Sequence, residues 1–188
     1  MNLLDPAIST YLDNLVPERP AELQGMERIA ESTKFPIIGP ASGQLCYLVA
    51  RMIGARRVFE LGSGYGYSTA WFARAVRENG GGEVHHVVWD ADLSNRARKH
   101  LEQLGYSVWF RYQKYREEYA LTDVVIAIDE TPVGVFVELE GDEHGILEAT
   151  RALGRTPDDF LLDSYRSLFM EHRRAHGQPA TDMLFDEA

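Results

Sequence analysis

The sequence has a single cysteine, no long apolar run and few basic residues. Cys46 is the one cysteine among 188 residues, so no disulfide can form within the chain. This is typical of a reducing compartment. No apolar segment approaches the ~20 residues that a transmembrane helix needs. The N-terminus carries Asp5 and lacks the basic region of a signal peptide. We therefore expect a cytoplasmic protein with no membrane partner.

Acidic residues outnumber basic ones, 29 against 19, which gives a formal net charge of -10. A chain of this charge repels the phosphate backbone of nucleic acids, so we expect a small-molecule ligand and no nucleic-acid partner. Hydrophobic residues make up 45% of the sequence. This is enough for the core of one domain or of two small ones.

In the first half of the chain, the apolar periodicity predicts alternating helices and strands. Helices are expected at about 5–16, 20–32, 41–54, 66–79 and 92–104, and strands at about 56–61 and 83–89. One side of the second helix should carry Leu23, Met26, Ile29 and Ala30. The inward side of the third helix should carry Leu45, Leu48, Val49 and Met52. The alternation predicts a parallel strand pair covered by helices.

A glycine-rich turn joins the first predicted strand to the next helix. The turn reads Gly62-Ser63-Gly64-Tyr65-Gly66 and follows the acidic residue Glu60. Glycines let a ligand approach the backbone closely, and the helix N-terminus that follows offers free N–H groups. The spacing lacks the Lys of a Walker loop and the full dinucleotide fingerprint. Asp90 ends the second predicted strand, where an acidic residue is placed to bind ribose hydroxyls.

These residues, together with the preceding segment 39–45, resemble the class I S-adenosylmethionine-dependent methyltransferases, and more closely the small catechol-type O-methyltransferases. The resemblance covers about residues 20–106. It implies a Rossmann-like half-domain that binds S-adenosylmethionine. The cofactor-binding residues that it implies are Glu60, Gly62, Ser63, Gly64, Gly66, Ser68 and Asp90. In those relatives the catalytic groups lie on later strands that are not recognisable in this sequence, so the catalytic residues are unknown.

From Ser107 onward the pattern changes to three strands with period-two alternation. Strands are expected at about 108–119, 124–129 and 135–140, joined by short turns into an antiparallel meander. Helices should follow at 142–153 and from Thr156 and Ser164, with a loose tail after Gly177. Val124, Ile126 and Ile128 alternate onto one face. The opposite face would carry Lys114, Arg116, Glu118, Asp129, Glu138 and Glu140.

This polar face has two interpretations. A one-sided sheet commonly exposes its polar side chains to water. Alternatively, the face forms a cavity wall in which Lys114 and Arg116 hold phosphate oxygens, while Glu138 and Glu140 hold a divalent metal.

The second interpretation is supported by another resemblance. Segments 110–119, 128–134, 137–141 and 163–165 resemble the CYTH proteins, the triphosphate-tunnel family of class IV adenylate cyclases and thiamine triphosphatases, over about residues 91–176. This resemblance implies phosphate contacts from Arg111, Lys114 and Arg116. Glu138 and Glu140 would bind Mg²⁺. The Glu-x-Glu-x-Lys signature of that family does not occur in this sequence.

We therefore predict an α/β fold made of two half-domains. Residues 1–106 would form the methyltransferase-like half and residues 107–188 the CYTH-like meander with its helices. The two halves would be packed as one unit with one mixed sheet. The hypotheses for function are S-adenosylmethionine binding, triphosphate or metal binding (with a homodimer pairing the open sheet edges), and a chimera that folds without native activity.

Overall fold

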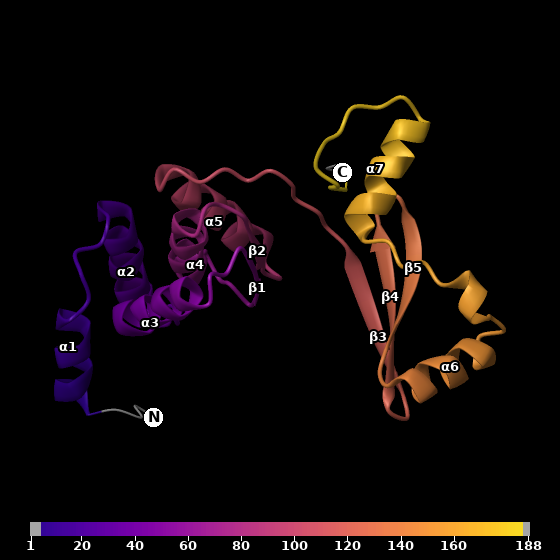
Figure 1. Ribbon diagram of the computed structural model, residues 1–188, viewed down its shortest axis with the longest axis horizontal. Helices are drawn as coiled ribbons and strands as arrows, with labels where there is room; N and C mark the ends of the chain where they lie inside the picture. The colour runs from indigo at the N-terminus through magenta and orange to yellow at the C-terminus, as the bar shows by residue number, and fades with distance from the viewer. Residues whose placement is uncertain (1–4, 186–188) are drawn as a thin grey trace. The chain divides into compact units, whose positions relative to one another are not determined.

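The computed structural model describes residues 5–185 and divides the chain into two compact units, at Val108 and Trp109. The first unit contains two strands and five helices, the second three strands and two α-helices (Figure 1). Within residues 5–185, no helix is both long enough and apolar enough to cross a membrane.

Helices and strands alternate in the first unit from α3 onward. Its elements are α1 (Pro6–Asn14), α2 (Ala21–Thr33), α3 (Gly39–Met52), β1 (Arg57–Leu61), α4 (Tyr67–Glu78), β2 (Glu83–Val87) and α5 (Ala91–Gln103). Strands β1 and β2 are parallel, and Leu61 lies opposite Val87. The chain therefore leaves both strands at the same edge of the sheet, and the segments after Leu61 and Val87 emerge side by side.

The core of the first unit lies between α2, α4 and α5. Met26 is 0% exposed, and Trp71 and Tyr65 are each 1% exposed. The Tyr65 hydroxyl donates to the Met26 carbonyl at 2.9 Å, so this buried ring has a partner for its polar tip. The prediction for α2 is confirmed for Leu23, Met26 and Ala30, which are buried.

The predicted inward face of α3 is wrong. Leu45, Leu48, Val49 and Met52 are exposed, Met52 at 84%. The buried residues of α3 are the small ones, Gly43 and Ala50. A Cβ at Gly43 would lie 2.3 Å from Trp71 Nε1, so this glycine lets the tryptophan of α4 approach the helix backbone.

The second unit is an antiparallel meander with two α-helices. Its elements are β3 (Tyr115–Leu121), β4 (Val124–Thr131), β5 (Gly134–Glu140), α6 (Glu143–Ala152), the 3₁₀ turn η1 (Pro157–Asp159) and α7 (Tyr165–Ala175). In Figure 1, α6 lies at the end of the meander where β4 begins, and α7 lies at the opposite end. The order is β3-β4-β5, with Arg116 opposite Asp129 and Asp129 opposite Phe136.

The expectation of one mixed sheet is wrong, because β1–β2 and β3–β4–β5 are separate sheets. The mixed sheet required a strand from about residue 108, but β3 begins only at Tyr115. The preceding residues have other partners. Phe110 packs 6.2 Å from Phe169 between ring centroids, and Tyr112 forms an isolated bridge with Met183. No strand therefore connects the parallel pair to the meander.

Up to residue 185, the segment after Gly177 is held by the same residues, which corrects the expectation of a loose tail over this part. Met183 is fully buried, and its N–H donates to the Arg111 carbonyl at 2.9 Å. The amide of Gln113 donates in turn to the Met183 carbonyl at 2.9 Å.

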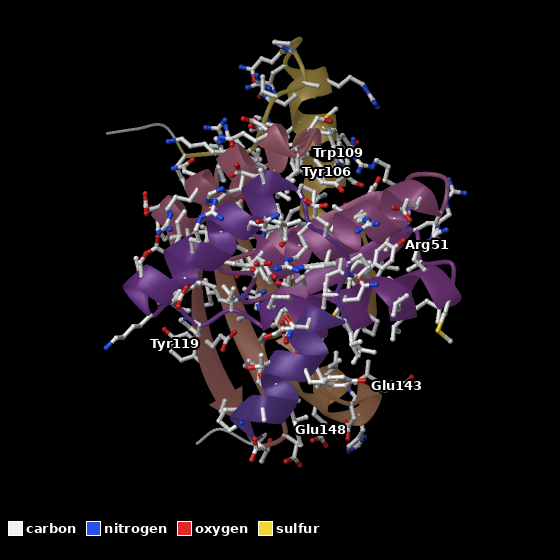
Figure 2. All side chains as sticks on the ribbon, turned by 90° about the vertical axis from the view of Figure 1, so that its left-hand side faces the viewer. Arg51, Tyr106, Trp109, Tyr119, Glu143 and Glu148 are labelled. Atoms are coloured by element: carbon white, nitrogen blue, oxygen red, sulfur yellow. The ribbon has the colours of Figure 1, made fainter. Side chains whose placement is uncertain are left out.

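One face of the meander is uncovered. Tyr115, Tyr119, Val135 and Val137 are 53–67% exposed. Figure 2 shows Tyr119 projecting outward from β3. The covered face is the polar one, because α7 places Tyr165 against it, and Asp129 there is fully buried.

Candidate functional site

The glycine turn takes a backbone conformation that only glycine adopts readily. Gly62, Gly64 and Gly66 all have positive φ, of 73°, 51° and 90°. A Cβ at Gly66 would lie 3.1 Å from the Cβ of Ala97, so this glycine also brings the start of α4 close to α5. Gly66 is the N-cap of α4 and forms no side-chain cap hydrogen bond. The first N–H groups of α4 therefore face the turn without a capping side chain.

A cavity of about 340 Å³ lies beside this turn. Gly62, Ser63, Gly64 and Ser68 line one side, with Tyr65 and Tyr67. The other side is the apolar loop segment 35–38, which the sequence analysis treated only as a connection. A Cβ at Gly62 would meet no atom within 4 Å, so the space beside this residue is open to a ligand. The apolar run Phe35-Pro36-Ile37-Ile38 was the signal that could have identified this wall.

Ser63 joins the two strand ends. Its hydroxyl donates to the Glu60 carbonyl at 3.0 Å and accepts from the Val87 amide at 3.3 Å. The amides of Gly62 and Ser63 both donate to the Val87 carbonyl, at 3.0 and 3.1 Å. The Ser63 side chain thus fixes the turn against β2.

Asp90 lies at the same sheet edge, three residues after the end of β2. It caps α5 by accepting a hydrogen bond from the Leu93 amide at 2.9 Å through Oδ1. The sequence pattern predicted a helix from Asp92, whereas the helix begins one residue earlier, at Ala91. The cap uses one carboxylate oxygen. The exposed Asp90 carboxylate keeps its second oxygen for a ligand.

Glu60 lies on the side of β1 that faces α4. Its Oε2 accepts from the Thr69 hydroxyl at 2.6 Å, and Thr69 Oγ1 lies 2.9 Å from Nδ1 of His86. Glu60, Gly66 and Asp90 are not among the residues that line the cavity. The structure therefore brings four of the seven predicted residues to its wall: Gly62, Ser63, Gly64 and Ser68.

Burial lowers the pKa of His86 below its ordinary value of 6.5, although the nearby Glu60 opposes this shift. The Nε2 atom of His86 is also buried, and no group within residues 5–185 forms a hydrogen bond with it. Protonation would therefore place an unpaired N–H⁺ in the interior.

This environment predicts a pH-dependent stability of the first unit. The folded pKa lies below the unfolded one, so the stabilisation is complete above pH 6.5 and declines as the pH falls below that value. Urea unfolding at about pH 7.5 and about pH 5.5 should show this loss. In a Trp89→Phe, Trp109→Phe background, the fluorescence of the buried Trp71 reports on this unit. His86→Leu should reduce the difference between the two pH values. An unchanged pH dependence in that variant would contradict the assignment.

The second unit contains a separate cluster of charged side chains on the covered face of the meander. Asp129 accepts from Lys114 Nζ at 2.7 Å, from Arg116 Nε and Nη2 at 2.7 and 2.8 Å, and from the Tyr165 hydroxyl at 2.6 Å. Arg116 also pairs with Glu138, and with Glu140 at 2.9 Å. The prediction that these side chains share one face is confirmed.

Arg116 and Asp129 are the centre of this cluster. Burial alone would raise the pKa of Asp129, but hydrogen bonds from Arg116, Lys114 and Tyr165 hold it well below its usual range. Hydrogen bonds to Asp129, Glu140 and Glu138 raise the pKa of Arg116, with the one to Asp129 as the main cause. Asp129 is the central acceptor that the sequence analysis left out of its candidate site. Its place in the middle strand of the meander was the available signal.

The other residues of the predicted phosphate and metal site are also occupied by ion pairs. Arg111 pairs with Asp182 through Nε at 2.7 Å. Glu138 and Glu140 both contact Arg116. Among the described residues, no group of three or more His, Cys, Asp or Glu side chains is arranged to hold a metal ion.

Comparison with known proteins identifies similarity to methyltransferases over about half of the chain. A family model described as "Methyltransferase domain" matches residues 59–152, which is half of the 188 residues. A catechol O-methyltransferase of Niastella koreensis is 29% identical over 106 residues, covering 55% of this chain and 47% of that protein.

Two further relatives give similar coverage. Protein-L-isoaspartate O-methyltransferase 2 of Pelobacter propionicus is 34% identical over 110 residues, covering 55% of this chain and 46% of that protein. A methyltransferase structure from Geobacter sulfurreducens is 35% identical, covers 54% of this chain and 53% of its own, and has a TM-score of 0.48. The chain thus spans about half the length of the curated relatives that it matches.

Proposed function

The chain belongs to the methyltransferase domain family, and from this membership we propose that its first unit binds S-adenosylmethionine in the manner of an O-methyltransferase. The main support for this proposal is the turn of three positive-φ glycines between a parallel strand and a helix, which lies beside a cavity of about 340 Å³. When bound, the cofactor would supply an electrophilic methyl group.

Each residue of the proposed site has a role that follows from its position. Gly62 and Gly64 keep the cavity wall free of side chains. Gly66 begins α4, and the first N–H groups of this helix would face the carboxylate of the cofactor's methionine part. Ser68, in the first turn of α4, offers a hydroxyl to the same end of the ligand. Asp90 would accept hydrogen bonds from the ribose hydroxyls.

Two predicted residues act indirectly in this proposal. Ser63 holds the turn on β2, and Glu60 holds Thr69 at the start of α4. Both are positioning residues. We assign no catalytic residue. The proposal therefore concerns cofactor binding, and it names no acceptor substrate for the methyl group.

Isothermal titration of the full chain with S-adenosylhomocysteine tests this site. Asp90→Ser should weaken binding by roughly tenfold or more, because it removes a charge-assisted hydrogen bond. Serine also caps helices well, so the start of α5 should survive the change.

The matched control is Asp142→Ser, at the N-cap of α6, where Asp142 accepts from the Gly145 amide at 2.7 Å. This variant makes the same chemical change far from the turn in sequence and should leave binding unchanged. No saturable heat from the unmodified chain, or equal affinity for Asp90→Ser, would refute the proposed cofactor site.

As a second candidate function, we propose triphosphate binding by Arg111, Lys114 and Arg116, with Mg²⁺ on Glu138 and Glu140. The convergence of Lys114 and Arg116 on one sheet face favours it. Their existing pairing with Asp129 opposes it, because a phosphate would have to replace that partner. This CYTH-type module could dimerise through the outer edges of β3 and β5.

A parallel titration with tripolyphosphate and Mg²⁺ separates the two functions. Heat in the titration with tripolyphosphate and Mg²⁺, but none with S-adenosylhomocysteine, would favour triphosphate binding by the second unit. Absence of heat with both ligands, from a chain that unfolds cooperatively, would leave the third hypothesis, a chimera without native activity.

A further inference from the structure

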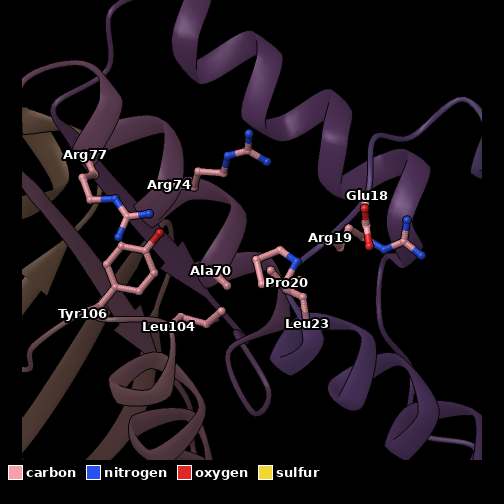
Figure 3. Close-up of a pocket in the computed structure, with 9 residues that line it drawn as sticks. All are labelled: Glu18, Arg19, Pro20, Leu23, Ala70, Arg74, Arg77, Leu104 and Tyr106. Carbon is pink, nitrogen blue, oxygen red and sulfur yellow. The ribbon is translucent and has the colours of Figure 1, made fainter.

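A second cavity of the first unit, of about 380 Å³, lies away from the glycine turn (Figure 3). It shares no lining residue with the cavity beside the turn. Its walls come from the loop before α2, the start of α2, one face of α4 and the segment after α5. The apolar floor is formed by Pro20, Leu23, Ala70 and Leu104.

Three arginines line this cavity, and two of them already have carboxylate partners. Arg19 forms two hydrogen bonds with Glu27, at 2.7 and 3.0 Å. Arg74 pairs with Glu78 at 3.0 Å. Glu27 thereby offsets the charge of Arg19. Glu78 also pairs with Arg51 at 3.5 Å, so Arg74 shares its carboxylate partner with a second guanidinium group.

Arg77 is different. Its guanidinium carbon lies 4.7 Å above the centre of the Tyr106 ring, and within residues 5–185 no carboxylate lies within 4.0 Å of its nitrogens. Stacking fixes the plane of the guanidinium and leaves its N–H edge free for a planar acceptor. In a chain of net charge -10, this places one uncompensated cation beside an apolar floor.

Figure 3 shows Glu18 and Arg19 on the side of the cavity opposite Arg77 and Tyr106. The Glu18 carboxylate therefore disfavours a ligand with negative charge at both ends. Arg77 is the lining arginine without a carboxylate partner among residues 5–185, and it suits one carboxylate, held in a bidentate manner. The floor between the two sides suits an apolar body.

From this arrangement we propose that the cavity binds a small organic monoanion, with its carboxylate on Arg77 and its apolar body on the floor between Pro20 and Leu104. This site is separate from the proposed cofactor site. It does not depend on whether the glycine turn binds S-adenosylmethionine.

The test is a titration of the ¹⁵N-labelled full chain with 3-phenylpropionate, followed by NMR shifts of the Ala70 and Leu104 amides. Saturable shifts are expected. Arg77→Gln should weaken binding by roughly tenfold or more, since it removes a charge-assisted contact. Arg77→Lys should weaken it too, because an ammonium group cannot stack flat and bind bidentately.

Three controls complete the test. Arg57→Gln, at an exposed arginine of β1, should not change the affinity. The neutral 3-phenylpropanol and inorganic phosphate should each bind more weakly than 3-phenylpropionate. Arg77→Gln should leave S-adenosylhomocysteine binding unchanged. The proposal fails if 3-phenylpropionate causes no saturable shift, if Arg77→Gln binds it equally well, or if phosphate alone competes with the same affinity.

Discussion

Replacing Asp129 with asparagine is expected to lower the free energy of unfolding of the second unit by about 3–5 kcal/mol, the cost of breaking a buried ion pair by removing one charge. Asp129 is fully buried and accepts from Lys114, Arg116 and Tyr165. The amide can accept fewer of these hydrogen bonds and presents N–H groups to cationic donors. Both cations would remain half-buried beside a neutral group.

Hydrogen exchange measured by mass spectrometry gives a local readout of this change. Peptides covering β4 and β5 should lose protection, whereas peptides from α4 in the first unit should keep theirs. The matched control is Glu118→Gln. Glu118 lies 3.7 Å from Arg116 but is 60% exposed, so this change should cost less than about 1 kcal/mol. Equal losses for both variants would show that Asp129 has no special role.

The same variant has a pH signature. Because the folded pKa of Asp129 is lowered, its stabilisation is present above the ordinary value of 3.8 and declines as the pH falls below it. In Asp129→Asn this contribution is absent at every pH. The acid-side decline in protection of the meander should therefore be shallower than in the unmodified chain.

The sequence predicted the meander better than the elements around it. Period-two alternation placed Lys114, Arg116, Glu138 and Glu140 on one face. The register confirms this for the three strand residues, and the ion pair with Asp129 confirms it for Lys114. The alternation could not show which face is covered. By composition the apolar face should be buried, but Val135 is 66% exposed and the polar face is covered by Tyr165 of α7. A helix distant in sequence decides this.

Segment 108–114 shows a second limit. Its aromatic residues alternate with polar ones as in a strand, yet Phe110 and Tyr112 pack on Phe169 and Met183. Alternation of apolar and polar residues indicates that every second side chain is buried. It does not identify the partner, which here is a helix and the C-terminal segment.

At the glycine turn the local prediction was stronger. Strand, turn and helix follow one another as expected, since positive φ at Gly62, Gly64 and Gly66 is a local property of the chain. The cavity wall at 35–38 was missed because it comes from another part of the sequence. Local geometry was therefore predictable, and the enclosure of the site was not.

Two glycines of the first unit yield substitutions of opposite sign, Gly43 at the contact between α3 and α4 and Gly25 within α2. Gly43→Ala should lower the free energy of unfolding of the first unit by about 1–3 kcal/mol, the usual cost of overpacking. Its new Cβ would lie 2.3 Å from Nε1 of Trp71, which is 1% exposed and has little room to move. Gly25→Ala should instead stabilise this unit by roughly 0.5–1 kcal/mol, because glycine is a poor residue within a helix. The nearest atom to its new Cβ is 3.7 Å away, on the flexible Arg28 side chain.

Urea unfolding of the Trp89→Phe, Trp109→Phe chain, followed by Trp71 fluorescence, measures Gly43→Ala and Gly25→Ala with the same probe. The two changes in the free energy of unfolding should have opposite signs. The reason for the loss can be tested by pairing Gly43→Ala with Trp71→Phe, measured by circular dichroism. Phenylalanine removes the indole nitrogen that the new methyl group would strike, so the pair should lose less stability than the sum of the two single changes. Additive losses would show that the contact with the Trp71 indole is not the cause of the loss. A combined loss smaller than the sum would show that Gly43 makes room for the Trp71 side chain. This agrees with the packing of α3, which exposes its large apolar residues and buries its small ones.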